Sequence, residues 1–214
     1  MFMKRENIAE RGIWTAKKRY ILNVWDSEGV RYEEPKLKMM GIEAVKSSTP
    51  APCRTMIKDA LKLMMRGTED DVIDFIENAR KEFNSLPPEE IAFPRTASNI
   101  RKYKSSSDIY VKGTPIHIRG ALLFNYYLKK KKLTNKYSAI ENGEKVKFLY
   151  LKKPNIIQEN VLSFIQDFPK EFGLSQYIDY ELQFEKSFVY PLKAILDAIG
   201  WEVERKVTLE SFFS

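Results

Sequence analysis

Three basic segments of the sequence contain the residues that could bind a polyanion. The first, "KKRY", sets three cations before an aromatic residue: Lys17, Lys18, Arg19 and Tyr20. The second, "NIRKYKSSSDIYVKG", interleaves cations with tyrosines and serines, which suits contacts to nucleic-acid phosphates. Its cations are Arg101, Lys102, Lys104 and Lys112, and its tyrosines are Tyr103 and Tyr110. In the third, "TPIHIRG", Arg119 falls in the first turn of an expected helix. Free N–H groups and the helix dipole attract anions at that position.

Each segment also has a simpler interpretation. Lysines on an exposed edge strand discourage sheets from pairing, and a polar surface loop would account for the second segment. His117 could be a hydrogen-bonded structural histidine. The lysine run 129–132 closes an expected helix, where cations match the negative end of the dipole. From these segments alone both interpretations stay open.

Residues that could hold a metal are few. The chain has one histidine and one cysteine, Cys53, which argues against a zinc site of the usual ligands. Asp26 and Glu28 lie in an expected turn, and the acids 69–71 lie in the first turn of an expected helix, where carboxylates belong. We therefore predict no metal site. The single cysteine excludes an internal disulfide and agrees with an intracellular setting.

Composition favours a globular protein with a polyanionic partner. Hydrophobic residues make up 43 % of the 214, enough for a core. No apolar run is long enough to cross a membrane, and the start "MFMKREN" lacks the features of a signal peptide. Thirty-six Lys and Arg exceed 29 Asp and Glu, giving a net charge of +7 and a pI of about 9.2.

The residues up to about Gly41 are expected to form strands. A short strand would cover 4–9, and period-2 alternation predicts a second over 17–25, followed by a turn at 26–29. On such a strand Lys17 and Arg19 would share one face, and Lys18 and Tyr20 the other.

The rest of the chain is mostly helical in pattern. Thr49 is expected to cap a helix that Gly67 ends, and Thr68 with Asp71 resembles a capping box that starts a second helix, ended by Pro87 and Pro88. A third would begin at Thr114 and Pro115 and end in the lysine run. "NGEKVKFLYL" predicts a turn and a strand, and a last helix over 177–199 would be kinked or split by Pro191. The fold class is therefore α+β.

Five segments in order resemble the C-terminal part of family B DNA polymerases of T4-like bacteriophages. They are "KKRYILNVWDSEG", "EEPKLKMMGIE" with "KSSTP", "TPIHIRG", "FEKSFVYPLKAIL" and "TLESFFS". The resemblance covers essentially the whole chain. It implies that residues 1–41 are the C-terminal end of the palm, that 42–206 are a mostly helical thumb with a small β element, and that 207–214 are a sliding-clamp-binding tail.

The resemblance also implies roles for the basic segments. Lys17 to Tyr20 match the motif that grips the primer–template duplex, where a lysine in the minor groove can test base-pair shape without reading sequence. Lys102, Tyr103, Lys112 and Arg119 match thumb residues that face duplex phosphates, with Lys112 one position away from the family's lysine. One helical turn would bring Leu209, Phe212 and Phe213 together as a clamp anchor, unless they pack internally.

The sequence lacks the family's catalytic motifs. The "DxxSLYPS" and "DTD" motifs, which hold two Mg²⁺ in the palm, are absent, as are the exonuclease acids and the fingers. We therefore predict no catalytic residue and no cofactor here, with both Mg²⁺ in a missing palm portion. A partner chain would supply exonuclease, fingers and the rest of the palm, in the cytoplasm of an infected bacterial host. Alone, the chain is expected to be inactive.

Two other functions remain open on the sequence. The chain could be a stand-alone, sequence-independent DNA-binding protein derived from a polymerase, or a clamp-interaction module that acts through its tail. Exposed apolar surface expected on the segments 4–9 and 17–25 favours the polymerase portion, because a divided palm leaves sheet edges that need partners.

Overall fold

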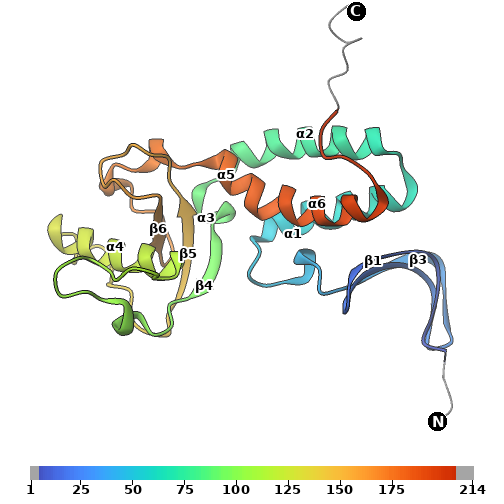
Figure 1. Ribbon diagram of the computed structural model, residues 1–214, viewed down its shortest axis with the longest axis horizontal. Coiled ribbons are helices and arrows are strands. Elements are labelled where there is room, and N and C mark those ends of the chain that lie inside the picture. Colours follow the sequence, from blue (N-terminus) through green and yellow to red (C-terminus); the bar gives the residue numbers. More distant parts are fainter. Residues whose placement is uncertain (1–4, 206–214) are drawn as a thin grey trace, which may run out of the picture. The chain divides into compact units, whose positions relative to one another are not determined.

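The computed structural model describes residues 5–205, which form two compact units (Figure 1). Within that range the first unit combines residues up to 46 with 53–82 and those from 188 onward, and the second combines 47–52 with 83–187. Each unit contains one three-stranded sheet together with helices. The predicted α+β class is confirmed.

The sheet of the first unit is an antiparallel meander. Its strands are β1 (Asn7–Ala16), β2 (Arg19–Ser27) and β3 (Val30–Met40), in the order β1-β2-β3. Glu28 and Gly29 have φ values of +54° and +90°, and the carboxylate of Asp26 accepts a hydrogen bond of 2.9 Å from the Gly29 N–H. The predicted turn at 26–29 is therefore confirmed.

Only half of the basic motif lies on a strand as predicted: Arg19 and Tyr20 begin β2, whereas Lys17 and Lys18 do not. Lys17 and Lys18 form the turn between β1 and β2, because Ala16 already pairs with Arg19. Lys18 takes a φ of +62° to close that turn. The prediction of a short strand over 4–9 was also wrong, since β1 runs up to this turn. Because β2 is the central strand, the free edges of the sheet belong to β1 and β3, and the segment 17–25 offers none.

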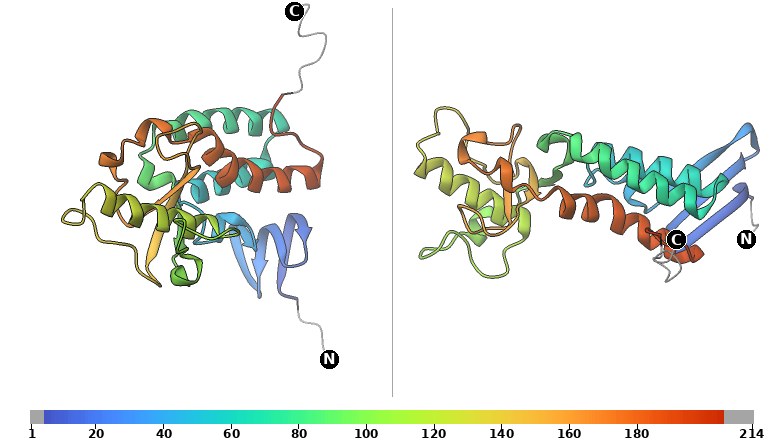
Figure 2. Two further views of the ribbon diagram at one scale, coloured as in Figure 1. Left: turned by 60° about the vertical axis from the view of Figure 1, so that its left-hand side comes forward. Right: turned by 90° about the horizontal axis from the view of Figure 1, so that it is seen from above.

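Helices of the first unit begin and end close to the predicted residues. The long helices are α1 (Ala51–Arg66) and α2 (Glu69–Ser85), and they lie together with α6 (Tyr190–Leu196) (Figures 1 and 2). The capping box is present: the Thr68 N–H donates to Asp71 Oδ2 at 2.7 Å, and the Asp71 N–H donates to Thr68 Oγ1 at 3.3 Å. The Thr68 backbone hydrogen bond, with the one from its side chain, lowers the pKa of Asp71. Apolar side chains of the three helices form the core: Ile57, Leu61, Val72, Ile76, Leu192 and Ile195.

The last helix is split, as Pro191 predicts. It consists of α5 (Tyr180–Phe184), a π-helical turn (Glu185–Val189) and α6, which starts just before the proline. A proline removes one backbone donor and clashes with the preceding turn, and a π-turn is one way to accommodate this. Asp179 caps α5 by accepting a hydrogen bond of 3.1 Å from the Leu182 N–H.

The second unit is a small sheet with one long helix packed on it. The strands β4 (Phe93–Thr96), β5 (Lys145–Tyr150) and β6 (Val161–Phe164) are antiparallel, and α4 (Ile116–Lys130) lies against β6. A Cβ atom on Gly120 would lie 2.4 Å from the Ser163 Oγ, so glycine allows this close packing. The structure confirms the predicted strand at 145–150 and the third helix, which starts after Pro115. The sequence did not predict β4 and β6.

Short helical turns complete the described chain. α3 (Pro88–Ile91) precedes β4. The 3-10 turns are Glu43–Val45, Ile100–Tyr103, Lys170–Phe172, Ser175–Tyr177 and Asp197–Ile199. No helix among the described residues has the length and apolar content that crossing a membrane requires.

Candidate nucleic-acid interface

The two lysines of the first basic segment are available to an anion. Lys17 and Lys18 are both exposed at the tip of the β1–β2 hairpin, and neither has an ion-pair partner within the part of the chain that the structure describes. Arg19 differs, because its Nη2 lies 2.9 Å from the Glu43 Oε2 and its charge is already paired. The turn therefore presents two ammonium groups side by side.

Tyr20 lies directly behind this turn. It occupies the second position of β2, where it pairs with Trp14 on one side and Met40 on the other. Opposite residues in an antiparallel sheet point to the same face. The phenol of Tyr20 is therefore held in an apolar row across the sheet, next to the lysines.

In the second unit the structure joins the second and third basic segments at Arg119. The Arg119 Nη2 donates to the Asn160 Oδ1 at 2.5 Å, and the guanidinium carbon lies 5.7 Å from the centre of the Tyr110 ring. The Arg119 Nε is buried and has no hydrogen-bond partner. The Tyr110 hydroxyl in turn donates to Glu159 at 2.5 Å. Burial raises the pKa of Tyr110, and this contact with Glu159 raises it further.

The other residues predicted to face duplex phosphates lie in one loop before α4. The Val111 N–H donates to the Tyr103 carbonyl at 3.0 Å, which brings the two ends of the loop together. Lys102 lies with its Nζ 5.8 Å from the Tyr103 ring, and both Lys102 and Lys112 are exposed. Lys112 precedes Gly113, whose φ of +82° turns the chain toward α4. The loop and the first turn of α4 thus carry cations within one unit.

His117 and Arg95 hold the second unit together. The His117 carbonyl accepts from the Ser163 hydroxyl at 2.8 Å, and its ring centre lies 6.5 Å from that of Phe148. Burial, and then the charge of Arg95, lowers the pKa of His117, although a backbone hydrogen bond with Thr96 raises it. The structural interpretation of His117 is the better one.

The sequence did not single out Arg95. Its Nη1 donates to the carbonyls of Ser48 at 2.7 Å and Pro94 at 2.8 Å, so it fastens the segment 47–52 to β4. An isolated arginine in a four-residue strand gives no local signal of that role.

The carboxylates considered as metal ligands serve other purposes. Asp26 closes a turn, Asp71 caps α2, and Glu69 accepts the Glu202 N–H at 2.6 Å. Among the described residues no cluster of three His, Cys, Asp or Glu side chains could hold a metal ion.

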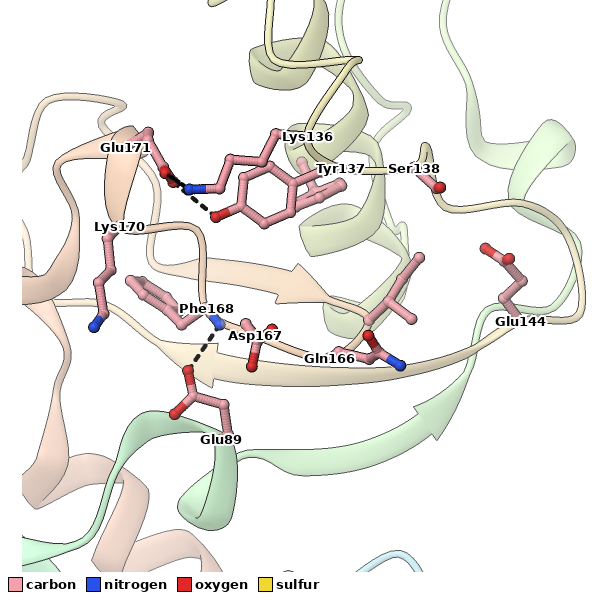
Figure 3. A pocket seen from close by; sticks show the side chains of 12 residues that line it. Glu89, Lys136, Tyr137, Ser138, Glu144, Gln166, Asp167, Phe168, Lys170 and Glu171 are labelled. Atoms are coloured by element: carbon pink, nitrogen blue, oxygen red, sulfur yellow. Dashed lines mark hydrogen bonds and ion pairs between the residues drawn. The ribbon is translucent and has the colours of Figure 1, made fainter.

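An open cavity of about 760 Å³ lies in the second unit (Figure 3). Two of its charged side chains are paired: Lys136 forms an ion pair with Glu171, and the Tyr137 hydroxyl donates to the other Glu171 oxygen at 2.7 Å. These two contacts hold the pKa of Glu171 at about 2. Glu89 accepts the Phe168 N–H at 2.8 Å. Both acidic and basic side chains line the cavity, so we do not assign it to the binding of a polyanion.

The residues predicted to bind a sliding clamp, Leu209, Phe212 and Phe213, lie outside the described residues. The chain is described as far as Arg205, which forms ion pairs with α2. Its Nη1 lies 3.4 Å from Glu77 and its Nε 4.0 Å from Asp70, and Asp74 is a third partner.

The sequence is similar to two bacteriophage DNA polymerases along almost all of its length. It is 37 % identical to the DNA-directed DNA polymerase of Escherichia phage RB69 over 100 % of this chain and 24 % of that relative. It is 33 % identical to the DNA-directed DNA polymerase of Enterobacteria phage T4 over 94 % of this chain and 22 % of that relative. The chain thus spans about a quarter of the length of these relatives, and the resemblance to T4-like phage polymerases is confirmed. No protein-family model matches.

The fold also has a solved counterpart. It matches part of the family B DNA polymerase from the hyperthermophilic archaeon Pyrobaculum calidifontis with a TM-score of 0.58, covering 93 % of this chain and 23 % of that one. At 14 % sequence identity this match concerns the fold alone.

Proposed function

We propose that this chain is the primer–template-gripping portion of a family B DNA-directed DNA polymerase. The observation that carries the proposal is the sequence match to the RB69 polymerase along the whole chain. In this account residues 1–41 are the C-terminal end of the palm, 42–206 the thumb and 207–214 the clamp-binding tail.

The exposed cations supply the grip. Each lysine or arginine that neutralises a phosphate releases condensed counterions, and this favours binding regardless of base sequence. Lys17 and Lys18, on a two-residue turn, form a narrow projection with two donors. The minor groove presents acceptors at nearly the same place for every correct pair, so these donors can contact any sequence.

Arg119 binds the phosphates of the duplex in this account. Its hydrogen bond to Asn160 and its contact with the Tyr110 ring hold the guanidinium in one orientation at the start of α4. A planar, pre-oriented guanidinium suits a phosphate better than a flexible ammonium does. Lys102, Tyr103 and Lys112 bind the backbone from the neighbouring loop.

Nucleotidyl transfer requires a partner chain. Exonuclease, fingers and the remaining palm, with the carboxylates that hold two Mg²⁺, belong to that polypeptide, because the sequence here lacks both carboxylate motifs. The tail, through Leu209, Phe212 and Phe213, binds a sliding clamp. The complex works in the cytoplasm of the infected bacterial host.

Primer extension tests this function. The purified chain with primer–template, Mg²⁺ and all four nucleotides should give no extension. RB69 polymerase lacking the segment that this chain matches should regain extension when the chain is added, and the double variant Lys17→Ala/Lys18→Ala should restore less. Extension by the chain alone would contradict the proposal. Duplex binding without any complementation would instead favour a stand-alone DNA-binding protein.

A further inference from the structure

An apolar row crosses one face of the first unit's sheet beside the basic turn. Trp14 of β1 pairs with Tyr20 of β2, which pairs with Met40 of β3, so the three side chains share a face. Trp14 is 65 % exposed and Met40 is 45 % exposed. A tryptophan this accessible is unusual, because large aromatic side chains are mostly buried.

The row is supported from within the sheet. A Cβ atom on Gly12 would lie 2.6 Å from two atoms of the Trp14 ring and 2.8 Å from the Leu22 Cδ2. The ring therefore lies over Gly12 and against Leu22, which is only 9 % exposed. One side of the indole is packed, and the other remains open to a ligand. A supported ring loses little conformational entropy on binding.

Exposed cations surround the row. Lys38 pairs with Leu22 and Lys36 with Val24, so both lysines lie on the same face as Trp14. Lys17 and Lys18 form the turn that joins β1 to β2, beside Trp14 and Tyr20. Lysine is depleted in the cores of protein–protein interfaces, so this combination does not favour a protein partner. Apolar surface between lysines matches duplex DNA, which offers sugar edges between two lines of phosphates.

We propose that Trp14, Tyr20 and Met40 form an apolar contact surface for the deoxyribose edges of duplex DNA, between Lys17 and Lys18 on one side and Lys36 and Lys38 on the other. This inference rests on the proposed function, since it assumes that the chain binds duplex. It adds a contribution that salt does not screen, because burial of the indole releases no counterions.

Duplex titrations of the full chain at several salt concentrations test the inference. Trp14→Ala should weaken binding about tenfold at every salt concentration, with the slope of log affinity against log salt unchanged. Lys17→Ala/Lys18→Ala should instead reduce that slope, by roughly 0.9 for each charge. Trp14→Phe should bind almost as the parent chain does. Val30→Ala, which truncates another exposed apolar residue (61 %) at the other hairpin turn, is the matched control and should have no effect.

Fluorescence gives a second readout that does not require a truncated side chain. In the variant Trp25→Phe/Trp201→Phe, Trp14 is the remaining tryptophan, and saturating duplex should shield it from iodide. Unchanged quenching together with normal duplex binding by Trp14→Ala would overturn the inference and leave the proposed function intact. Self-association of the parent chain, lost in Trp14→Ala while duplex binding persists, would overturn it in favour of a second copy as occupant. If the parent chain did not bind duplex at all, the proposed function itself would be wrong.

Discussion

A Cβ atom on Gly41 would lie 2.5 Å from the carbonyl oxygen of Lys18, so the basic turn is built directly against a glycine. Gly41 also has a φ of +67°, a conformation that other residues adopt only with strain. The end of β3 thereby fixes the position of the two lysines. Any larger residue at 41 would have to move them.

Gly41→Ala should therefore destabilise the first unit and weaken duplex binding together. We expect a loss of about 1–3 kcal/mol in the free energy of unfolding, from strain and from the close contact. Gly29→Ala is the matched control, since Gly29 also has a positive φ but open space around it. It should lose only roughly 1 kcal/mol and bind duplex normally. Urea titration and duplex titration check both, and equal effects of the two variants on binding would contradict the role of Gly41.

Arg119→Ala should reduce duplex affinity to a similar extent for unrelated sequences, because its proposed ligand is a phosphate. The salt slope should fall by about 0.9, and Arg119→Lys should recover the slope but only part of the affinity. Lys145→Ala, an exposed lysine at the start of β5, serves as the control within the same unit. If the variant Arg119→Ala differed from the parent chain in how strongly affinity depends on duplex sequence, Arg119 would contact bases instead.

The second unit should lose stability in acid through Glu171. Lys136 and Tyr137 lower the pKa of this carboxyl from 4.5 to about 2 in the folded chain. A carboxyl whose pKa is lower in the folded chain than in the unfolded chain stabilises the fold at pH values above its unfolded pKa. That stabilisation disappears as the pH falls toward its folded pKa. The melting temperatures of the parent chain and Glu171→Gln should thus differ most above pH 5 and converge near pH 2. Glu90→Gln, exposed on α3, should show no such convergence. A pH-independent difference for Glu171→Gln would exclude this explanation.

Local chemistry predicted the parts of the fold that depend on neighbouring residues. The capping box of Thr68 and Asp71, the turn at Gly29 and the helix interruption at Pro191 each follow from residues a few positions apart, and the structure contains all three. Strands β4 and β6 have only four residues each, too few for a periodic signal.

The site was less predictable, because its geometry depends on distant residues. Alternation over 17–25 hid the Lys17–Lys18 turn, since neither lysine is a typical turn residue. Gly41, which accommodates the turn, lies two strands further along the chain, after β3. The partners of Arg119 are equally remote in sequence: Asn160 is 41 positions away. The position of the arginine in a helix's first turn favoured an anion as its ligand, but the sequence did not predict which residues would orient it.

Deletion of residues 209–214 should abolish binding to a sliding clamp and leave duplex affinity unchanged. The reason is that Leu209, Phe212 and Phe213 supply the apolar anchor in the proposed function, whereas the cations lie elsewhere. The clamp of phage RB69 or T4 is the appropriate probe, and surface plasmon resonance measures both interactions. Phe212→Ala/Phe213→Ala provides a version without truncation. Unchanged clamp affinity in both variants would exclude a clamp-binding role for the tail.

In the proposed function this chain grips primer–template duplex without reading its sequence. Equilibrium titration of the purified chain with several duplexes of unrelated sequence, each at a series of salt concentrations, tests this property. We expect dissociation constants that agree within about threefold between sequences, and a steep salt dependence that becomes shallower in Lys17→Ala/Lys18→Ala and in Arg119→Ala. Lys62→Ala, an exposed lysine on α1 that is paired with Asp59, should behave as the parent chain does. Affinities that differ by orders of magnitude between sequences, or that do not change with salt, would rule out this mode of binding.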